Sequence, residues 1–463
     1  MSHPGKHTQD EARSMTISRH AGVVGGPGDD TGHVGRPGPV GEAAGHHAGR
    51  PGGGHPGGHG GHPGRASDPR PGVGDFDFSQ SPWLVIWETT RACDLACKHC
   101  RAEAIPHRDP GELSTVEAKR LLEDVRRFGR VLFVFTGGDA LKREDIFELT
   151  EHGSKLGLRM AMTPTVSPRV TPDTLQRLKL AGLARISVSI DGSTPAIHDA
   201  IRGVPGCWDW AVRILREAKE AGLSTQVNTT VSNWNLEDFD ALYELMTTLG
   251  IVFWEVFFLV PTGRARPQDV PTPEQWEQVF HRMYDLSKDA PFDIKATAAP
   301  QYRRVVVQRQ VAERRQGSRE QAPDELTAGL DFSLSDGVGR AKGVNDGDGF
   351  MFVSHTGEIY PSGFLPLSSG NVRTADLVET YRTAPLFQQL RDRSLLKGKC
   401  AVCEYRPICG GSRARAFGIT GDPLEAEPFC AHVPVRYQKM VERGEAEPVE
   451  EYFRKRARRL PTV

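Results

Sequence analysis

A repeated alternation of short apolar runs and amphipathic segments is the feature that most constrains the fold of this chain. From residue 82 onward each apolar run has the length of a strand and each following segment the spacing of a helix, in cycles of about 30 residues. Such alternation predicts a parallel sheet with right-handed helical crossovers. Six cycles favour an α/β fold built on a partial (β/α)6 TIM-like barrel, while periodicity alone leaves a flat, doubly wound sheet open. The predicted strands lie at residues 83–90, 131–135, 158–163, 184–190, 223–231 and 251–259.

The predicted helices carry recognisable start and stop signals. Ser114 and Glu117 form a capping box ahead of apolar residues at helical spacing. Pro172 occupies the first position of a later helix, and Gly182 follows its end. These signals support helices between the strands and a barrel core at residues 82–290.

The N-terminal segment has a composition unlike the rest of the chain. Residues 1–74 contain 21 of the 50 glycines and 9 of the 16 histidines, and they contain no aromatic residue and no cysteine. Such a segment buries too little apolar surface to offset the entropy lost on ordering, so we predict a disordered Gly/Pro/His-rich tail. Its histidines could hold nickel or zinc loosely, but the ordering cost for each ion favours a solvated tail.

Charge and hydropathy argue against several classes of protein. The formal net charge of -1 provides no general attraction to nucleic acid or to anionic membranes. The apolar runs fall short of the ~18 residues of a membrane span, and no signal peptide is recognisable. We therefore expect a cytoplasmic protein with reduced thiols, whose clustered cysteines serve metal binding or catalysis rather than a disulfide framework.

Beyond residue 290 the alternation ends. Residues 291–344 are predicted to hold a basic helix, for which we expect a solvated face, and a loosely structured connector. An alternating stretch that turns at His355–Gly357 predicts a β-hairpin, and a short helix follows near 376–391. The last four cysteines indicate a small domain at 345–440 that metal helps to stabilise, before a basic tail at 441–463.

Three of the eight cysteines lie close together in the loop after the first predicted strand. Cys93, Cys97 and Cys100 have the spacing Cys-x3-Cys-x2-Cys, and loops after barrel strands meet at the face where active sites form. A structural zinc site closes its coordination with four ligands, and His99 adjoins Cys100 too closely to serve readily as the fourth. Three thiolates around a four-iron cube would instead leave one iron open to a non-protein ligand. Cys207 has no partner spacing and is expected to be a buried small hydrophobe.

Several motifs together resemble those of the radical S-adenosylmethionine (SAM) enzymes. The stretch CDLACKHC is similar to their cysteine signature, with His99 at a position that is usually aromatic. The turn TGGDA places Gly137, Gly138 and Asp139 after the second strand, where the family carries a Gly-Gly-acidic turn. The stretches SVSIDG and HDAIRG extend the likeness, which covers residues 82–260 and 345–432.

The resemblance implies a [4Fe-4S] cluster whose open iron is chelated by SAM. An electron passed into the cluster would cleave a carbon–sulfur bond of SAM. The resulting 5′-deoxyadenosyl radical would then abstract hydrogen from a substrate in a site closed to water. A reduced ferredoxin or flavodoxin is the implied electron donor.

The same resemblance implies contacts to SAM. The backbone of Gly137 and Gly138 would approach the methionine amino group closely, which favours residues without side chains. The further cofactor contacts that the resemblance implies are His99, Asp139 (where glutamate is commoner), Ser189 and Asp191 toward the ribose, Arg202 toward the carboxylate, and Asn228. For each of these residues the alternative is an ordinary capping or turn role.

The last four cysteines have a different spacing, Cys-x2-Cys-x5-Cys-x20-Cys, at Cys400, Cys403, Cys409 and Cys430. This arrangement resembles the C-terminal auxiliary-cluster (SPASM or Twitch) domain of radical SAM enzymes. Full SPASM domains have seven cysteines, and this chain departs from them with Ser362 and Arg413 at two expected positions. Four thiolates suffice for one cube, so we predict one fully ligated auxiliary [4Fe-4S] cluster in a small C-terminal iron-sulfur domain, with zinc as the alternative.

The substrate is less constrained than the chemistry. The four-cysteine spacing resembles the radical enzymes of haem biosynthesis, which remove or trim propionate groups, so we predict a tetrapyrrole, and basic residues of 299–315 could meet its propionates. A ribosomally made peptide is the alternative, although residues 1–74 offer no winged-helix peptide-binding module. A zinc-stapled binding protein without catalysis would make both cysteine groups structural, but it leaves three ligands beside a Gly-Gly turn unexplained.

Overall fold

One sheet of nine strands organises the part of the chain that the structure describes. This computed structural model describes residues 77–317, 329–331 and 340–457, so the predicted tail at 1–74 and the end of the basic tail lie outside the described residues. The nine strands are β1 (Leu84–Glu88), β2 (Leu132–Thr136), β3 (Arg159–Met162), β4 (Leu183–Ser189), β5 (Ser224–Val231), β6 (Phe253–Phe258), β7 (Asp293–Thr297), β10 (Phe350–Val353) and β11 (Ile359–Tyr360). Two further strands, β8 (Gly329–Asp331) and β9 (Arg340–Lys342), form a separate antiparallel pair.

The sheet is parallel through almost its whole width. Its strands follow the order β11-β10-β1-β2-β3-β4-β5-β6-β7, and only the β10–β11 hairpin is antiparallel. This order is linear, with β11 and β7 at its two edges, so the barrel is partial. The predicted α/β class and the incomplete barrel are therefore confirmed.

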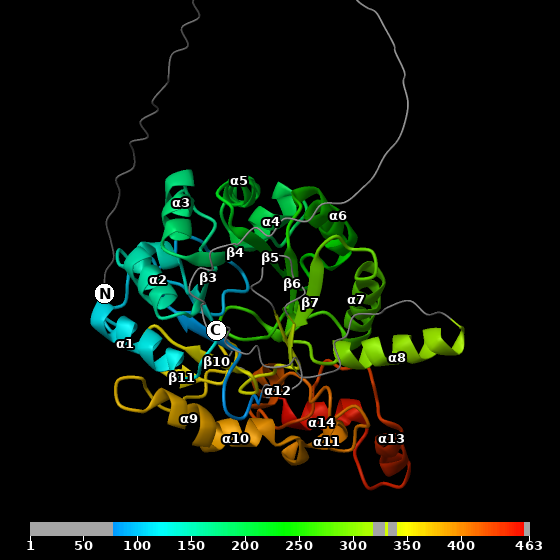
Figure 1. The fold of residues 1–463 in the computed structure, drawn as a ribbon. Helices are drawn as coiled ribbons and strands as arrows, with labels where there is room; N and C mark the ends of the chain where they lie inside the picture. The colour runs from blue at the N-terminus through cyan, green and yellow to red at the C-terminus, as the bar shows by residue number, and fades with distance from the viewer. Residues whose placement is uncertain (1–76, 318–328, 332–339, 458–463) are drawn as a thin grey trace, which may run out of the picture. The chain divides into compact units, whose positions relative to one another are not determined.

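Helices fill the crossovers between the strands. Figure 1 shows them around the outside of the sheet, which places their apolar faces against the outer side of the strands. On the first helix, Leu121, Leu122 and Val125 are fully buried against this layer. The crossover helices are α1 (Thr115–Arg126), α2 (Ile146–Lys155), α3 (Pro172–Leu180), α4 (Pro195–Arg202), α5 (Cys207–Glu220), α6 (Phe239–Leu249) and α7 (Pro273–Leu286), with 3-10 turns η1 (Ala140–Lys142), η2 (Leu236–Asp238) and η3 (Pro267–Asp269).

The predicted helix boundaries rest on the expected caps. The backbone N–H of Glu117 donates to the Ser114 hydroxyl, and the Glu117 carboxylate accepts from the Ser114 backbone N–H at 2.8 Å. Pro172 begins α3 behind the capping side chain of Thr171, and Gly182 follows its end at a φ of +95°. The local signals therefore set these helix ends.

Three strands, β7 and the hairpin pair β10 and β11, extend the sheet beyond the six that the periodicity predicts. β7, with the sequence DIKAT, pairs in parallel with β6 although it contains no apolar run. The predicted hairpin forms, and its first strand β10 pairs in parallel with β1, with Leu84 opposite Phe350. The hairpin thus continues the barrel sheet, and the domain boundary at residue 345 stays a prediction.

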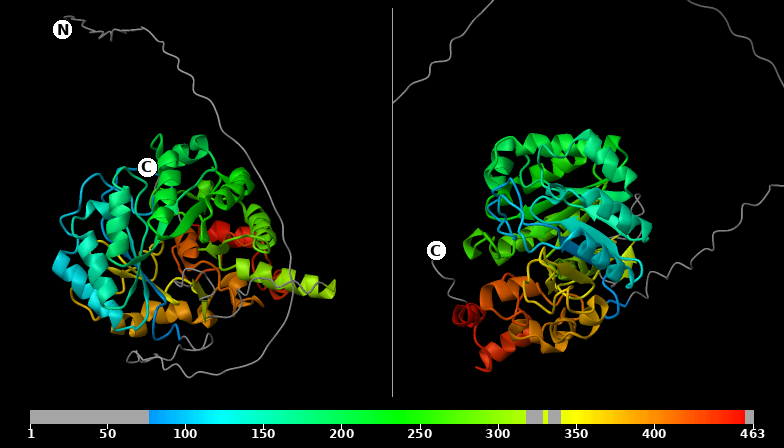
Figure 2. Two further views of the ribbon diagram at one scale, coloured as in Figure 1. Left: turned by 45° about the horizontal axis from the view of Figure 1, so that its top comes forward. Right: turned by 90° about the vertical axis from the view of Figure 1, so that its left-hand side faces the viewer.

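The helices that follow β7 make up the C-terminal part of the described chain, and the orange and red ones lie together below the barrel in the right-hand view of Figure 2. The first of them is the predicted basic helix, and the solvated face expected for it is wrong for its first turn, because Tyr302–Val306 are buried. None of the helices in the described ranges combines the length and the hydropathy that crossing a bilayer requires. These helices are α8 (Tyr302–Arg315), α9 (Leu377–Thr383), α10 (Pro385–Arg391), the 3-10 turn η4 (Arg393–Leu395), α11 (Gly398–Ala401), α12 (Arg413–Thr420), α13 (Val435–Glu442) and α14 (Val449–Arg456).

Candidate functional site

The three cysteines of the loop after β1 line one cavity. Each thiol is free of disulfide bonding and receives a hydrogen bond: the backbone N–H of Leu95 donates to Cys93 at 3.4 Å, and that of Ala104 to Cys100 at 3.5 Å. Cys97 accepts from Nη1 of Arg202 at 3.7 Å. Donors of this kind stabilise thiolates, which are the form that binds iron. The three cysteines singled out by their spacing therefore line one cavity, and their role as cluster ligands stays a prediction.

The Gly-Gly turn after β2 lies against the cysteine loop. The N–H of Gly138 donates to the Thr90 carbonyl at 2.7 Å, and the N–H of Asp139 donates to the Ala92 carbonyl, also at 2.7 Å. A Cβ at Gly137 would overlap the backbone of Thr90, and one at Gly138 would lie 2.6 Å from the Ala92 carbonyl carbon. Both glycines also line the cavity of the three cysteines. Contact between two loops therefore demands glycine here, in addition to the approach to a ligand expected from the sequence.

A buried carboxylate links the cysteine loop to the ends of β4 and α4. Asp191 is fully buried and accepts from Nε2 of His99 at 2.8 Å, from Nη2 of Arg202 at 2.7 Å and from the N–H of Thr230 at 2.8 Å. Burial alone would raise the pKa of Asp191, but the Arg202 guanidinium and His99 outweigh it and hold this pKa well below its usual range. Asp191 thereby fixes two side chains that line the cavity, His99 and Arg202.

The other predicted SAM contacts occupy three different places. Ser189 lines the cavity of the cysteines, whereas Asn228 lines only the deeper barrel cavity and accepts from Gln226 Nε2 at 2.7 Å. The Asp139 carboxylate accepts from the N–H of Leu141 and from the Ser167 hydroxyl, so it caps η1, and burial raises its pKa. The structure thus brings Ser189 to the cysteines and gives the Asp139 side chain the capping role.

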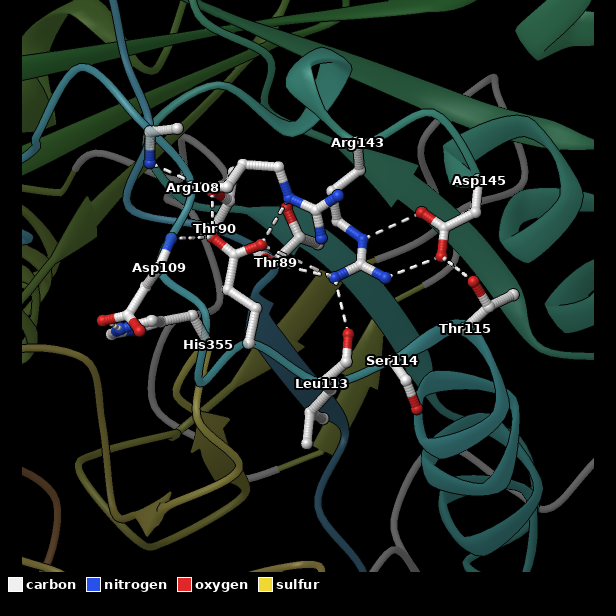
Figure 3. Close-up of polar contacts among 12 residues, drawn as sticks. Thr89, Thr90, Arg108, Asp109, Leu113, Ser114, Thr115, Arg143, Asp145 and His355 are labelled. Carbon is white, nitrogen blue, oxygen red and sulfur yellow. Dashed lines mark hydrogen bonds and ion pairs between the residues drawn. The ribbon is translucent and has the colours of Figure 1, made fainter.

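A polar network that the sequence did not reveal fastens the start of the cysteine loop (Figure 3). The Thr90 hydroxyl donates to the buried carboxylate of Glu112, which also accepts from Nε of Arg108 at 2.6 Å. Arg143, fully buried, donates to the Leu113 carbonyl at 2.9 Å and forms a two-pronged ion pair with Asp145. Since these partners come from two separate connections, between β1 and α1 and between β2 and α2, only the folded chain shows how they meet.

The barrel interior holds a deeper cavity of about 310 Å³. Nine residues also line the cavity of the cysteines, among them His99, Ser189 and Arg202, so the two cavities adjoin. One wall is apolar and comes from β1, β2, β3 and β10; its residues are Trp83, Leu84, Ile86, Leu132, Val134, Ala161, Phe350 and Phe352. The opposite wall is polar and comes from β4 to β7; its residues include Arg185, Ser187, Ser189, Gln226, Asn228, Thr230, Glu255, Lys295 and Thr297.

Positive charge predominates around the deeper cavity. Among the described residues that line it, the carboxylates are Glu255 and Asp346, and five side chains are cationic. Lys295 Nζ lies 3.7 Å from Glu255 Oε1, and Arg101 pairs with Glu88 at 2.8 Å beside the Phe352 ring. The five cationic side chains are Arg101, Arg185, Arg202, Lys295 and Arg303. Such a lining suits an anionic ligand with a large apolar surface.

The last four cysteines also share a cavity, next to the first turn of α8. None forms a disulfide, and all four residues line this cavity together with Arg304, Lys399 and His432. The Gly411 N–H donates to Cys409 at 3.3 Å, and the Glu427 N–H donates to Cys400 at 3.4 Å. A buried ion pair between Glu427 and Arg415, at 2.9 Å, holds this segment in place. Four thiols with few competing donors fit an iron-sulfur cube or zinc.

The two positions that depart from a full SPASM pattern have other surroundings. Ser362 lines the barrel cavity and does not line the cavity of the four cysteines. Arg413 is buried, and its guanidinium donates to the carbonyls of Gly411, Pro423 and Glu425. Cys207 is fully buried, as expected, and its thiol donates to Asp199 at 3.2 Å.

Comparisons with known proteins connect this geometry to a family. Residues 87–246 match the model of the radical SAM superfamily. The chain is 41% identical over 362 residues to the AdoMet-dependent heme synthase of Nitratidesulfovibrio vulgaris, covering 78% of this chain and 95% of that protein. It is 39% identical to the protein of the same name from Methanosarcina barkeri, covering 77% of this chain and 98% of that protein.

A solved structure agrees on the fold. SuiB of Streptococcus suis bound to S-adenosylmethionine superposes with a TM-score of 0.56 over 76% of this chain and 78% of that chain, at 15% identity. At this low identity the structural match shows the fold alone. The sequence relatives exclude the alternative of a zinc-stapled binding protein without catalysis. The chain therefore belongs to the radical SAM enzymes, in the branch of the AdoMet-dependent heme synthases, a family that uses a [4Fe-4S] cluster and SAM.

Proposed function

We propose that this enzyme removes carboxyl groups, as CO2, from propionate side chains of an iron-bearing haem precursor, with a hydrogen atom passing to the 5′-deoxyadenosyl radical and the remaining electron passing to a one-electron acceptor of the iron-sulfur class. The observation that carries the proposal is the two-sided barrel cavity, with one apolar wall and one cationic, polar wall. A porphyrin has broad apolar faces and carries its carboxylates at the rim, so each wall has a partner on such a substrate. Relatives near 40% identity are named AdoMet-dependent heme synthases, which supports the same substrate class.

Two cationic side chains are the proposed carboxylate partners. Lys295 on β7 and Arg303 on the first turn of α8 line the cavity from adjacent elements. The Arg303 guanidinium is held by the carbonyls of Ile408 and Val344 at 3.0 Å and 2.7 Å, which orients it before a ligand arrives. A fixed guanidinium and a lysine on the same side favour a ligand with more than one carboxylate.

The residues that line the cavity of Cys93, Cys97 and Cys100 have proposed roles that follow from their contacts. Cys93, Cys97 and Cys100 would hold the cluster, whose chemistry, when it is bound, is the reductive cleavage of SAM to a 5′-deoxyadenosyl radical. Arg202 and Ser189 line the remaining space and are the proposed SAM contacts. Asp191 has its oxygens occupied by His99, Arg202 and a backbone N–H, so we assign it the positioning of those groups.

The four C-terminal cysteines are proposed to hold a second [4Fe-4S] cluster. Their common cavity supplies a complete set of thiol ligands, in contrast to the three of the first site. Anaerobic protein should then contain about eight irons per chain, whereas about four irons with added zinc would refute the second cluster.

The substrate is tested with anaerobically reconstituted enzyme, dithionite and SAM. We expect 5′-deoxyadenosine formation to increase with iron-coproporphyrin, together with porphyrin products that have lost carboxyl groups. Cys97→Ala should abolish both. Turnover of SAM without any change in the porphyrin would refute the proposed substrate while leaving the enzyme class intact. Radical SAM enzymes need an electron donor, and a reduced ferredoxin or flavodoxin is the one we propose for the cell.

A further inference from the structure

Gln301 carries a buried amide group that nothing in the described part of the chain satisfies. The residue is 1% exposed, and neither Nε2 nor Oε1 has a hydrogen-bond partner among the described residues. Its side chain lines the cavity of the four C-terminal cysteines. Buried amides without partners are rare because losing water without a replacement is costly, so the amide indicates a partner that binds in this cavity.

Arg304 shows the same pattern one helical turn later. Nη1 and Nη2 form a two-pronged ion pair with Glu277 at 2.7 Å and 2.5 Å, while the buried Nε has no partner among the described residues. Arg304 lines the same cavity, and the pKa of its guanidinium, which burial alone would lower, is raised by Glu277, Cys430 and Cys409. Gln301 and Arg304 are three residues apart at the start of α8, so they present donors on one face.

The neighbours of Gln301 face the other way. Pro300, Tyr302 and Arg303 line the barrel cavity, whereas Gln301 and Arg304 line the cysteine cavity. The start of α8 is therefore the wall between the two spaces, and it is held on the cysteine side by the contact of Arg303 with the Ile408 carbonyl at 3.0 Å. This packing fixes the Gln301 backbone beside the cavity of the four cysteines.

We propose that the Gln301 side chain donates a hydrogen bond to the cluster held by the four C-terminal cysteines and thereby raises the reduction potential of that cluster. The inference rests on the proposed second cluster. A reduced cluster carries one more negative charge than an oxidised one, so a fixed donor stabilises the reduced form more strongly. Gln301 is a positioning and tuning residue, since it acts on the cluster and not on the substrate.

The test is a redox titration of the full holoenzyme followed by electron paramagnetic resonance. Addition of SAM changes the signal of the three-cysteine cluster, which identifies it and makes it an internal reference. Gln301→Leu removes the donors at similar size, and Gln301→Glu replaces the amide with a carboxylate of the same shape. We expect the potential of the four-cysteine cluster to fall in the first variant and to fall further in the second, with the three-cysteine cluster unchanged.

A matched control lies at the other end of the same helix. Gln316 is exposed beyond the last turn of α8, and Gln316→Leu should leave both potentials as in the wild type. Unchanged potential of the four-cysteine cluster in Gln301→Leu, with full iron content, would overturn the inference. So would loss of that cluster in both Gln301 variants, because the residue would then only support the fold. Wild-type protein with about four irons would instead refute the second cluster itself.

Discussion

Replacing Gly138 with alanine tests whether the Gly-Gly turn positions the cysteine loop. The new Cβ would lie 2.6 Å from the Ala92 carbonyl carbon and 2.7 Å from the Arg91 carbonyl oxygen. Both are backbone atoms, so no side chain can rotate to relieve the overlap. Restoring ordinary contact distances requires the loop before Cys93 to move by about 1 Å.

The magnitude follows from two contributions. Overpacking against a fixed backbone costs about 1–3 kcal/mol, and the two backbone hydrogen bonds between the turn and the loop, at 2.7 Å each, contribute about 1 kcal/mol apiece. We therefore expect Gly138→Ala to lower the free energy of unfolding by about 3–5 kcal/mol. A domain of ordinary stability survives such a loss, but the cysteines no longer converge as they do in the wild type.

The assay combines urea unfolding under anaerobic conditions with the iron content and SAM binding of the folded variant. Gly111→Ala is the matched control, because its Cβ would meet only side-chain atoms, Asp109 Oδ1 at 3.2 Å and Thr356 Cγ2 at 3.4 Å. We expect this control to change stability by less than about 0.5 kcal/mol and to load iron normally. Wild-type stability, iron and SAM binding in Gly138→Ala would refute the reasoning.

Three further predictions concern other parts of the molecule. Burial, followed by the Arg202 guanidinium, lowers the pKa of His198 to about 4, so the folded state favours the neutral ring. The contribution of His198 to the free energy of unfolding is therefore complete above about pH 6.5 and is lost as the pH falls toward 4. Between pH 7 and pH 5 the wild type should therefore lose about 2 kcal/mol more than His198→Asn in urea unfolding, and parallel curves would contradict this. Glu427→Gln leaves Arg415 buried without its counter-charge, so we expect a loss of about 3–5 kcal/mol and release of iron from the four-cysteine site; an unchanged melting temperature and iron content would show that the ion pair is dispensable. Lys295→Met should weaken binding of iron-coproporphyrin by about 10–100-fold in an absorbance titration, while Lys119→Met on the outside of the barrel should not; equal affinities would exclude Lys295 as a carboxylate partner.

Local chemistry explains what could be predicted of the fold. The capping box at Ser114 and the proline at position 172 act within one turn of helix, so their effect is visible in the sequence. β7 escaped prediction because it lies at the edge of the sheet with Lys295 and Thr297 facing a polar cavity, and such a strand needs no apolar run. The pairing of β10 with β1 joins residues that are remote in the chain, and alternation alone does not encode a partner.

The candidate site also has some features that the sequence predicts and others that only the folded structure shows. The convergence of Cys93, Cys97 and Cys100 follows from spacing within a single loop, which sequence reveals directly. The dependence of His99 and Arg202 on Asp191 joins the cysteine loop to the ends of β4 and α4, and the buried amide of Gln301 becomes informative only once its surroundings are known. A residue such as Gln301, whose role is indicated by a buried polar group without a hydrogen-bond partner among the described residues, leaves no pattern in the sequence.

The pairing of Leu84 with Phe350 has a consequence for how the chain matures during synthesis. The ribosome releases β1 and the three-cysteine loop long before β10, so one side of β1 stays exposed while most of the barrel is made. The thiols of the three-cysteine loop are therefore made well before the β10 strand covers this side of the barrel. A chain that terminates before residue 350 would present the open edge of β1, with Leu84 and Ile86, to other nascent chains and would be prone to aggregate.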